Sequence, residues 1–589
     1  MFCRIWLLVL AVGVCAPSFA QVNAGQLLEQ AQQTQRPKTA PLPPEAPDKP
    51  ADPKIPAIAD GEVGVRIRSL ILIGDPVHLS DTQWKTLNGL VKGKELSFIG
   101  LQGLADRVAS MLRSDGFPLA QAFLPEQDVS QGVLRIAVQL GRFDNPAFEV
   151  IDKAARLRPG LVSQWLAIRL QPGEVVRGTQ LNEALILVNE LSGVSAQGEF
   201  IAGDQPGTAR LRVTVQEESP LQIRTGLANT GNKTTGIEML STSVQRSNAL
   251  GFGERFGLSL NRSRGMSLWT GDLAWPANAN GGWLEMSLSQ LHYESISQDP
   301  GMQGLNGDSV VGSFTWRQAL WRDLRRSASW QANFEYKKMV DDNLVGADVF
   351  HMSDKLIQAM NLRLDGQQQF NVGAGLSFSG RVGLRVGRLS LPDRDNVTSN
   401  LASDQNPGSG LFTQGDYRKF TWQLQGQQFL GAGWYVGASG TGQRALGHKN
   451  LDGSEKMSLG GPNGVRAYPS GEASGDHAHI LSAELGYSFL LPNGESVGVS
   501  AFYDKGWIWM YANPTIAGRS DIASNDQQLS HYALGGYGMN FVLSRSGRFS
   551  LSITWARKDG PNPGSVQQGK DSDGRSDRER WWLSYQLQF

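Results

Sequence analysis

An arginine and an aspartate in two separate segments are the side chains best suited to form a buried ion pair. Arg466 lies in the Gly- and Ser-rich segment 459–476, and Asp504 ends the alternating run 497–504. A charge held away from water is costly unless it is paired, and the planar guanidinium fork matches a carboxylate. We therefore expect an Arg466–Asp504 pair that fixes the segment. In the alternative interpretation, Arg466 is an exposed loop residue and Asp504 a turn residue at a strand end.

Other candidate sites lack part of the chemistry that their spacing suggests. The run from Gly564 to Lys570 matches most of a phosphate-binding loop, but Asp571 stands where Ser or Thr would bind magnesium. His477 and His479 would share one face of a strand, yet no third metal ligand accompanies them, and we interpret them as loop histidines. No nucleophile or acid/base pair emerges. We expect no enzyme, no cofactor and no metal site.

The segment 219–589, which contains Arg466 and Asp504, predicts a barrel of strands. Apolar and small polar residues alternate over runs such as 549–556 and 581–589, which is typical of strands with lipid on one face and water on the other. At about 23 residues per strand and connection, the segment 219–589 gives about 16 antiparallel strands. A soluble sandwich or propeller would also alternate, but it would not normally end on an aromatic residue such as Phe589.

The first 20 residues have the features of a secretory signal peptide. Arg4 precedes an apolar run over residues 5–14, and Ser18-Phe19-Ala20 offers a small-x-small cleavage site. Cys3 and Cys15 lie in this segment, so the rest of the chain contains no cysteine, as suits an oxidising compartment. A lipoprotein signal at Cys15 is a weaker alternative. No later segment approaches the 18 or so consecutive apolar residues of a membrane-spanning helix.

Residues 21–36 predict a helix and residues 37–60 a linker. The helical segment is rich in glutamine and carries few apolar residues, mainly Leu27 and Leu28. Such a helix cannot bury much against a core and suits the wet lumen of a barrel; a disordered leader is the alternative. Eight prolines lie among the residues from Pro37 to Pro56, which predicts a semi-rigid linker reaching about 60 Å.

Two α/β units are expected between the linker and the barrel, over residues 63–142 and 143–218. The first follows the order strand–helix–helix–strand–strand, and the second repeats its helix stripe and closing strand. The order resembles the POTRA fold, the polypeptide-transport-associated domain of outer-membrane exporters. The closing pattern carries the resemblance: Gly116, Phe117, Ala120, Gly132, Leu134, Ile136, Val138 and Gly141.

Three further motifs resemble those of outer-membrane exporters. The segment Val465-Arg466-Ala467-Tyr468 is similar to their VRG(F/Y) loop signature, with Ala467 in place of the usual Gly. The run 502–506 is similar to their aspartate motif, and the run 229–236 to their first barrel hairpin. A terminal Phe589 resembles the signal that the barrel-assembly machinery recognises.

Together these parts resemble the TpsB-type two-partner secretion family, which exports haemolysins, adhesins and contact-dependent inhibition toxins. The resemblance implies a Gram-negative outer-membrane location with the POTRA domains in the periplasm. It implies that these domains bind one large secreted partner protein, which crosses the barrel unfolded and without ATP. The helix 21–36 would plug the pore at rest and residues 465–468 would form a gating loop. Outer-membrane lipid and the barrel-assembly machinery would be the other partners.

Two other functions fit part of the sequence. A barrel-assembly factor or insertase of the same superfamily would usually carry more POTRA units and lack the helix and linker, and a passive porin would carry no POTRA unit. The N-terminal 60 residues therefore favour an exporter. The formal net charge is +0, with 55 basic and 55 acidic residues, so nothing points to nucleic acid as a partner.

Overall fold

The computed structural model describes residues 23–33, 64–91, 95–154, 156–298, 302–345, 348–392, 401–406, 410–514, 529–565 and 569–589. The predicted signal peptide, residues 1–20, and the predicted linker, residues 37–60, lie outside these ranges.

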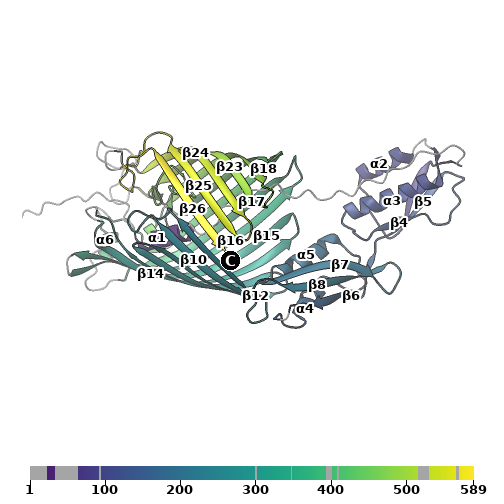
Figure 1. Ribbon diagram of the computed structural model, residues 1–589, viewed down its shortest axis with the longest axis horizontal. Coiled ribbons are helices and arrows are strands. Elements are labelled where there is room, and N and C mark those ends of the chain that lie inside the picture. The colour runs from purple at the N-terminus through teal and green to yellow at the C-terminus, as the bar shows by residue number, and fades with distance from the viewer. Residues whose placement is uncertain are drawn as a thin grey trace, which may run out of the picture.

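Sixteen strands in the described part of the chain form a closed antiparallel barrel, with β26 pairing with β9 at the seam (Figure 1). In chain order they are β9 (Leu221–Ala228), β10 (Met239–Ser247), β11 (Arg255–Ser263), β12 (Met266–Asn278), β13 (Gly282–Glu294), β14 (Leu305–Arg322), β15 (Arg326–Val345), β16 (Asp348–Phe370), β17 (Leu376–Ser390), β18 (Gly415–Gly431), β19 (Trp434–Leu446), β22 (His477–Leu490), β23 (Ser496–Trp509), β24 (His531–Arg545), β25 (Phe549–Lys558) and β26 (Glu579–Gln588). The predicted strand number is confirmed.

The alternation of side chains along the strands has the predicted two faces. On β26, Trp581 and Leu583 point outward and are exposed, whereas Trp582 between them points inward and is buried. On β25, Ser552 and Thr554 face inward and are buried. An outer face of large apolar side chains suits lipid, and an inner face of small polar side chains suits a water-filled lumen.

The two rims of the barrel differ in the length of their connections. On one rim the turns are short, such as residues 432–433 and 546–548. On the other rim the connections range from the two residues 264–265 to the long segments 391–414, 447–476, 510–530 and 559–578. The long connections contain α6 (Leu401–Asp404), η1 (Gly453–Glu455), β20 (Met457–Ser458) and β21 (Ser474–Gly475). The α/β units lie at the short-turn rim (Figure 1).

The two α/β units share one sheet topology, as the predicted repeat requires. The first contains β1 (Val65–Arg66), β2 (Ser69–Gly74), α2 (Asp81–Val91), β3 (Glu95–Leu96), α3 (Phe98–Ser114), β4 (Gln121–Phe123) and β5 (Val133–Gln139), with the sheet order β2-β5-β4. The second contains β6 (Arg142–Asp152), α4 (Leu161–Ala167), α5 (Gly178–Asn189), β7 (Val194–Ala202) and β8 (Thr208–Glu217), with the order β6-β8-β7. In each, the last strand is central, parallel to the first and antiparallel to the other.

The first predicted strand is divided in the structure. Val65 and Arg66 pair with β3, whereas β2 starts at Ser69 and pairs with β5. The alternation of apolar residues shifts at Ser69, and the chain changes partner strand near this position.

Each α/β unit has its own apolar core between helices and sheet. Leu104 and Val108 of α3 pack against Ile136 of β5 in the first unit, and all three side chains are buried.

In the second unit Arg156 forms an ion pair with Glu217 at the end of β8, at 3.1 Å. Hydrogen bonds from the Arg156 side chain lower the pKa of the Glu217 carboxyl below its usual value.

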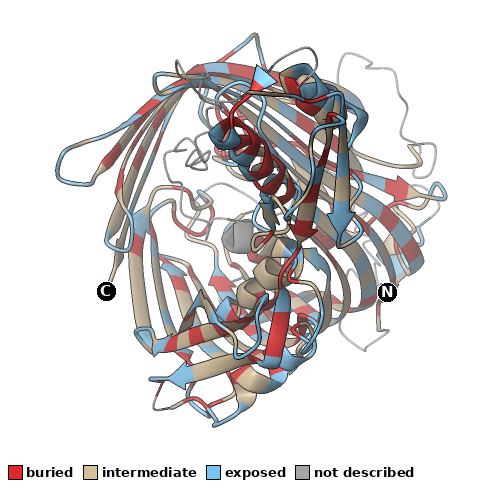
Figure 2. Ribbon diagram, turned by 90° about the vertical axis from the view of Figure 1, so that its right-hand side faces the viewer, coloured by how far each residue is buried: buried red, intermediate tan, exposed pale blue. Residues whose placement is uncertain are grey.

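The second α/β unit is joined to the barrel at the short-turn rim. Arg322 Nε at the end of β14 lies 2.6 Å from Glu190 Oε1, just after α5. The backbone N–H of Ser192 donates to Gly253 O in the β10–β11 turn, at 2.9 Å. The Arg158 guanidinium lies over the Phe252 ring of the same turn, 4.0 Å from its centroid. Figure 2 looks toward the barrel from this side and shows the α/β units in front of the barrel opening.

A helix occupies the barrel lumen. This helix, α1 (Ala24–Gln33), falls within the predicted helical segment 21–36 and lies inside the ring of strands (Figure 1). None of the helices in the described ranges has the length and apolar character needed to cross a membrane.

Candidate functional site in the barrel lumen

The connection between β19 and β22, residues 447–476, folds back into the barrel. Its stem is the short pairing of β20 with β21. Beyond the stem, Val465, Ala467 and Tyr468 are fully or almost fully buried against the inner wall. They form one apolar cluster with Phe502, Ile508, Leu534 and Ala556 from the wall strands. The loop tip is therefore buried as completely as the core of a protein.

Arg466 lies against Asp504 in a two-pronged ion pair. Arg466 Nε donates to Asp504 Oδ2 at 2.8 Å, and Nη2 donates to Oδ1 at 2.7 Å. The backbone N–H of Arg466 also donates to Oδ2, at 3.1 Å. Asp504 is completely buried, so its charge depends on these donors. The structure thus brings together the two residues that the sequence singles out, and Arg466 is not an exposed loop residue.

Further contacts orient the arginine. Ser482 of β22 accepts from Arg466 Nη2 at 3.0 Å and donates to Asp504 Oδ1 at 2.7 Å. The Arg466 guanidinium lies over the Phe502 ring, 3.2 Å from its centroid. Trp582 Nε1 of β26 donates to the carbonyl oxygen of Arg466 at 2.7 Å. Phe502 could be found from the sequence, because it lies two residues before Asp504 and shares its face. Ser482 and Trp582 carry no such signal.

Glycines in the wall make room for the loop tip. A Cβ atom at Gly536 would lie 2.5 Å from the Cβ of Ala467, and one at Gly506 would lie 2.9 Å from Cγ2 of Val465. Real Cβ atoms do not approach other atoms this closely, so these two wall positions require glycine. Ala467 keeps a φ in the ordinary negative range, which is why alanine is accommodated there.

Helix α1 is seated on the same loop and on the opposite wall. Its first backbone N–H, at Ala24, donates to Asp341 Oδ1 of β15 at 2.9 Å. Leu27 and Leu28 are buried in a cluster with side chains from β10 and β12 through β19, among them Leu291, Met339 and Ile357. The expectation that the helix buries little is therefore wrong. Two leucines suffice to bury one side of the helix because the lumen supplies apolar partners, which the composition of the helix does not reveal.

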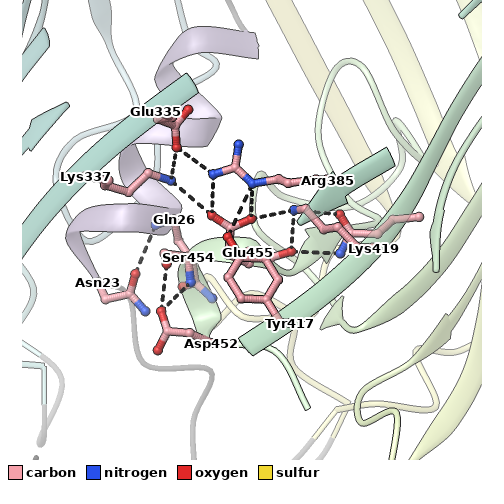
Figure 3. A network of polar contacts seen from close by, with 11 residues as sticks. Asn23, Gln26, Glu335, Lys337, Arg385, Tyr417, Lys419, Asp452, Ser454 and Glu455 are labelled. Carbon is pink, nitrogen blue, oxygen red and sulfur yellow. Dashed lines mark hydrogen bonds and ion pairs between the residues drawn. The ribbon is translucent and has the colours of Figure 1, made fainter. Parts of the chain in front are cut away.

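The helix lies in contact with η1 of the folded-back loop. A Cβ atom at Gly25 would lie 2.2 Å from the Ser454 Cβ, so only glycine permits this approach. Next to Ser454, Glu455 is nearly fully buried and meets three cationic side chains. These are Lys337 at 3.4 Å, Arg385 at 2.9 Å and Lys419 at 2.9 Å, from three different strands (Figure 3).

This polar cluster, formed by Glu455 with Lys337, Arg385 and Lys419, holds η1 against the wall. Glu335 of β15 contributes a second carboxylate, whose Oε1 lies 2.6 Å from Arg385 Nη2 (Figure 3). Removing one member of such a cluster would leave a buried charge without compensation. No pattern in the sequence predicts this cluster, because its members come from four separate segments.

Two other sets of residues considered in the sequence lie elsewhere. His477 and His479 are not in a loop: they begin β22 and share its outward face, where His479 stacks on Trp422 with ring centroids 5.9 Å apart. In the described part of the chain, no group of three or more His, Cys, Asp or Glu side chains is arranged to hold a metal ion. Phe589 follows β26 and is exposed, and its backbone N–H donates to Ile223 O of β9 at 2.8 Å.

A closed sixteen-stranded barrel with a folded-back loop, a lumenal helix and two α/β units at the short-turn rim defines a protein-transporting outer-membrane barrel. Residues 207–523 match the family model of the haemolysin secretion/activation proteins ShlB/FhaC/HecB, and residues 66–141 match the ShlB-type POTRA domain. The first match covers more than half of the chain, and the chain therefore belongs to this family.

Individual proteins show the same relationship. The heme/hemopexin transporter protein HuxB of Haemophilus influenzae (strain 86-028NP) is 24% identical over 495 residues, which cover 84% of this chain and 81% of that protein. The outer membrane transporter CdiB of Escherichia coli is 23% identical over 451 residues, covering 75% and 72%. The solved structure of CdiB from Escherichia coli has a TM-score of 0.65 at 19% identity, covering 96% of this chain and 99% of that chain.

This chain is thus a two-partner secretion transporter of the outer membrane, with its POTRA domains in the periplasm, and it exports a partner protein. It is a transporter and not an enzyme. The short-turn rim, where the POTRA domains lie, is the periplasmic rim of the barrel.

Proposed function

We propose that this transporter captures one large partner protein with its POTRA domains and passes it unfolded through a lumen that α1 blocks at rest. The observation that supports this proposal is the position of α1 inside the barrel. A helix buried on one side and resting on the folded-back loop closes the lumen through contacts that a moving chain can replace. The periplasm holds no ATP, so folding of the partner outside the cell would prevent its return. The partner would be a haemolysin, an adhesin or a contact-dependent inhibition toxin.

Strand β2 of the first POTRA domain is the edge we propose for capture. Among the described residues it pairs only with β5, so its other edge is open to an added strand. Ile71 and Ile73 on this strand are exposed, although both are large and apolar. Substituting both with aspartate is expected to reduce co-purification of the partner's N-terminal region. Ile168→Asp, at an exposed isoleucine of the second POTRA domain, is the control and should have little effect.

Withdrawal of α1 can be tested with a cross-link. The Cβ that a side chain at Gly453 would add lies 3.9 Å from Cγ of Asn23, close enough for a disulfide after a small adjustment. In a background without other cysteines after Cys15, the pair Asn23→Cys and Gly453→Cys should block export under oxidising conditions. Reduction should restore export, and each single variant should export normally. Full export by the oxidised pair would contradict the withdrawal of α1.

Phe589 is proposed as part of the signal for the barrel-assembly machinery. It directly follows β26, continues the outward apolar face of that strand and is exposed. Phe589→Ala should lower the amount of folded protein in the outer membrane, whereas Leu583→Ala on the same face should lower it less. Equal losses for the two variants would indicate a general effect on the strand.

The overall function is best tested by comparing proteins in the culture supernatant and on the cell surface, with and without the transporter. Loss of one very large polypeptide would establish a dedicated exporter and identify its partner. Loss of many outer-membrane proteins would contradict a dedicated exporter.

A further inference from the structure

The inner wall of the barrel is divided into a charged part and a neutral part. Strands β11–β14, β16 and β17 carry inward-facing charged side chains in their periplasmic halves, and several pair with each other: Glu285 with Arg317 at 3.1 Å, and Asp365 with Arg381 at 2.6 Å. Among the described residues, the periplasmic halves of β18, β19 and β23 through β26 carry no charged side chain on this face.

The neutral part presents amides, hydroxyls and glycines at alternate positions. Gln423, Gln425 and Gln427 follow one another on the inner face of β18. Ser439 lies on the inner face of β19, and Ser500 lies on the inner face of β23. Between these strands, β22 contributes one charged residue, Glu484, which pairs in register with Gly437 of β19 and Phe502 of β23 and lines the same cavity. It accepts from Tyr435 Oη at 2.9 Å, and its other carboxylate oxygen lies 4.0 Å from Arg466 Nη1. We call the inner faces of these periplasmic halves of β18, β19 and β23–β26 the neutral wall.

A cavity of about 910 Å³ runs along the neutral wall while α1 is in place. Gln423, Ser439 and Ser500 line it on one side, and Gln26 and Glu29 of α1 line it on the other. A second cavity, of about 270 Å³, lies toward β15–β17 and shares Gln423 and Gln425 with the first. The glutamines of β18 therefore border both cavities.

Among the described residues, most of the strands that pack against α1, and all of the barrel turns named above for the second POTRA domain, lie outside the neutral wall. Leu27 and Leu28 of α1 pack in a cluster that draws its wall residues from β10 and β12–β19. The second POTRA domain contacts the described barrel turns and strand ends at Phe252, Gly253, Ala279 and Arg322, which lie between β10 and β15. None of these contacts involves the periplasmic turns 432–433 and 546–548 of the neutral wall.

From these observations we infer that the neutral wall is the path along which the extended partner chain crosses the barrel. Conduction requires binding that is weak and distributed over many sites. Amides and hydroxyls exchange hydrogen bonds with a passing peptide backbone at a net gain of only about 0.5–1.5 kcal/mol each. In a partly dehydrated lumen, charged wall side chains would bind oppositely charged residues of the passing chain, and repel residues of like charge, far more strongly. The proposed path rests on the export function and specifies where in the barrel the partner crosses.

A cross-linking experiment separates the two walls. A photoreactive maleimide is attached to a single cysteine in the full-length protein, at Ser439 or Ser500 on the neutral wall, or at Ser259 or Ser287 on the inner faces of β11 and β13. Cells also produce the partner with a tightly folded carboxyl-terminal fusion, which stalls export. We expect at least 10-fold more cross-linked partner from Ser439→Cys and Ser500→Cys than from the two controls. Equal yields from both walls, or a higher yield from the controls, would overturn the inference.

A charge placed on the path gives a second readout. Gln425→Arg combined with Ser500→Arg should reduce the exported partner at least 10-fold, whereas Ser259→Arg combined with Ser287→Arg should change it less than twofold. Heat-modifiable migration on gels shows that each barrel has folded. Equal effects of two folded variants would contradict a preferred wall. Absence of export by the unsubstituted protein would instead contradict the export function itself.

Discussion

Two ion pairs of similar geometry show how burial determines what an arginine contributes. Arg466 and Asp504 approach to 2.7 Å with the carboxylate fully buried. Arg388 and Asp416 approach to 2.6 Å with both side chains about two-thirds exposed. Exposed pairs contribute about 0–1 kcal/mol. Breaking a buried pair costs about 3–5 kcal/mol, because the remaining charge stays dehydrated.

Arg466→Ala is therefore expected to release the loop tip, while Arg388→Ala should change little. Limited proteolysis of the loop 447–476 in the purified protein gives the measurement, with cleavage becoming at least 10-fold faster only in Arg466→Ala. The double variant Arg466→Ala/Asp504→Asn should recover part of the loss, because it removes the unpaired charge. Identical cleavage of Arg466→Ala and the unsubstituted protein would show that the pair does not hold the loop.

A second prediction concerns the contact between Ala467 and Gly536. Gly536→Ala would bring two Cβ atoms within 2.5 Å, and overpacking of this kind costs about 1–3 kcal/mol. Ala467→Gly in the same protein removes one of the two atoms and should restore stability, measured as the unfolding temperature in detergent. Gly271→Ala is the matched control, because a Cβ there meets nothing within 4 Å. Failure of Ala467→Gly to restore stability would mean that another clash dominates.

At the scale of elements, α1 and η1 behave as one packed unit. Gly25 contacts Ser454 on one face of the helix, whereas Gln26 on the adjacent face borders the large cavity. The cluster around Glu455 then fixes η1 to β15, β17 and β18. Displacement of the helix therefore removes a contact from the loop.

Gly25→Leu should unseat α1, whereas Gln26→Leu should leave it in place. An overpacking cost of about 1–3 kcal/mol corresponds to an approximately 5–150-fold change in the population of the seated helix. Single-channel recordings in planar bilayers would detect this change as a higher open fraction for Gly25→Leu. Similar open fractions for the two variants would contradict the role of the Gly25 contact.

At the scale of the whole molecule, the second POTRA domain is fixed to one side of the barrel mouth. The ion pair of Arg322 with Glu190 links the end of β14 to the residue after α5, and Arg169 adds a hydrogen bond to Ala279 O at 2.9 Å. These contacts fix the position of the second POTRA domain relative to the lumen.

Reversing either charge of the Arg322–Glu190 pair should reduce export several-fold, because hydrogen bonds to charged groups contribute about 1.5–3 kcal/mol. The exchange Arg322→Glu/Glu190→Arg should recover most of the exported partner. The amount of partner in the supernatant, normalised to folded barrel, gives the comparison. An exchange variant as deficient as the single variants would show that the position of the domain depends on other contacts.

The sequence by itself determined the parts of this protein that depend on local patterns. Alternation with a period of two residues is a local property of strands, so it predicted the barrel and its strand number. The helix–strand order predicted the two α/β units, and a charge placed in a lumen pattern required a partner, which pointed from Arg466 to Asp504. Each of these predictions uses residues close in sequence or a general requirement for charge pairing.

The tertiary structure alone decided how the lumen is filled. Three cations from β15, β17 and β18 surround Glu455, and Trp582 reaches the carbonyl oxygen of Arg466, 116 residues away in sequence. No periodicity connects such positions, because closure of the barrel brings distant strands together around one axis. For the same reason, helix composition did not reveal that Leu27 and Leu28 find apolar partners inside the barrel.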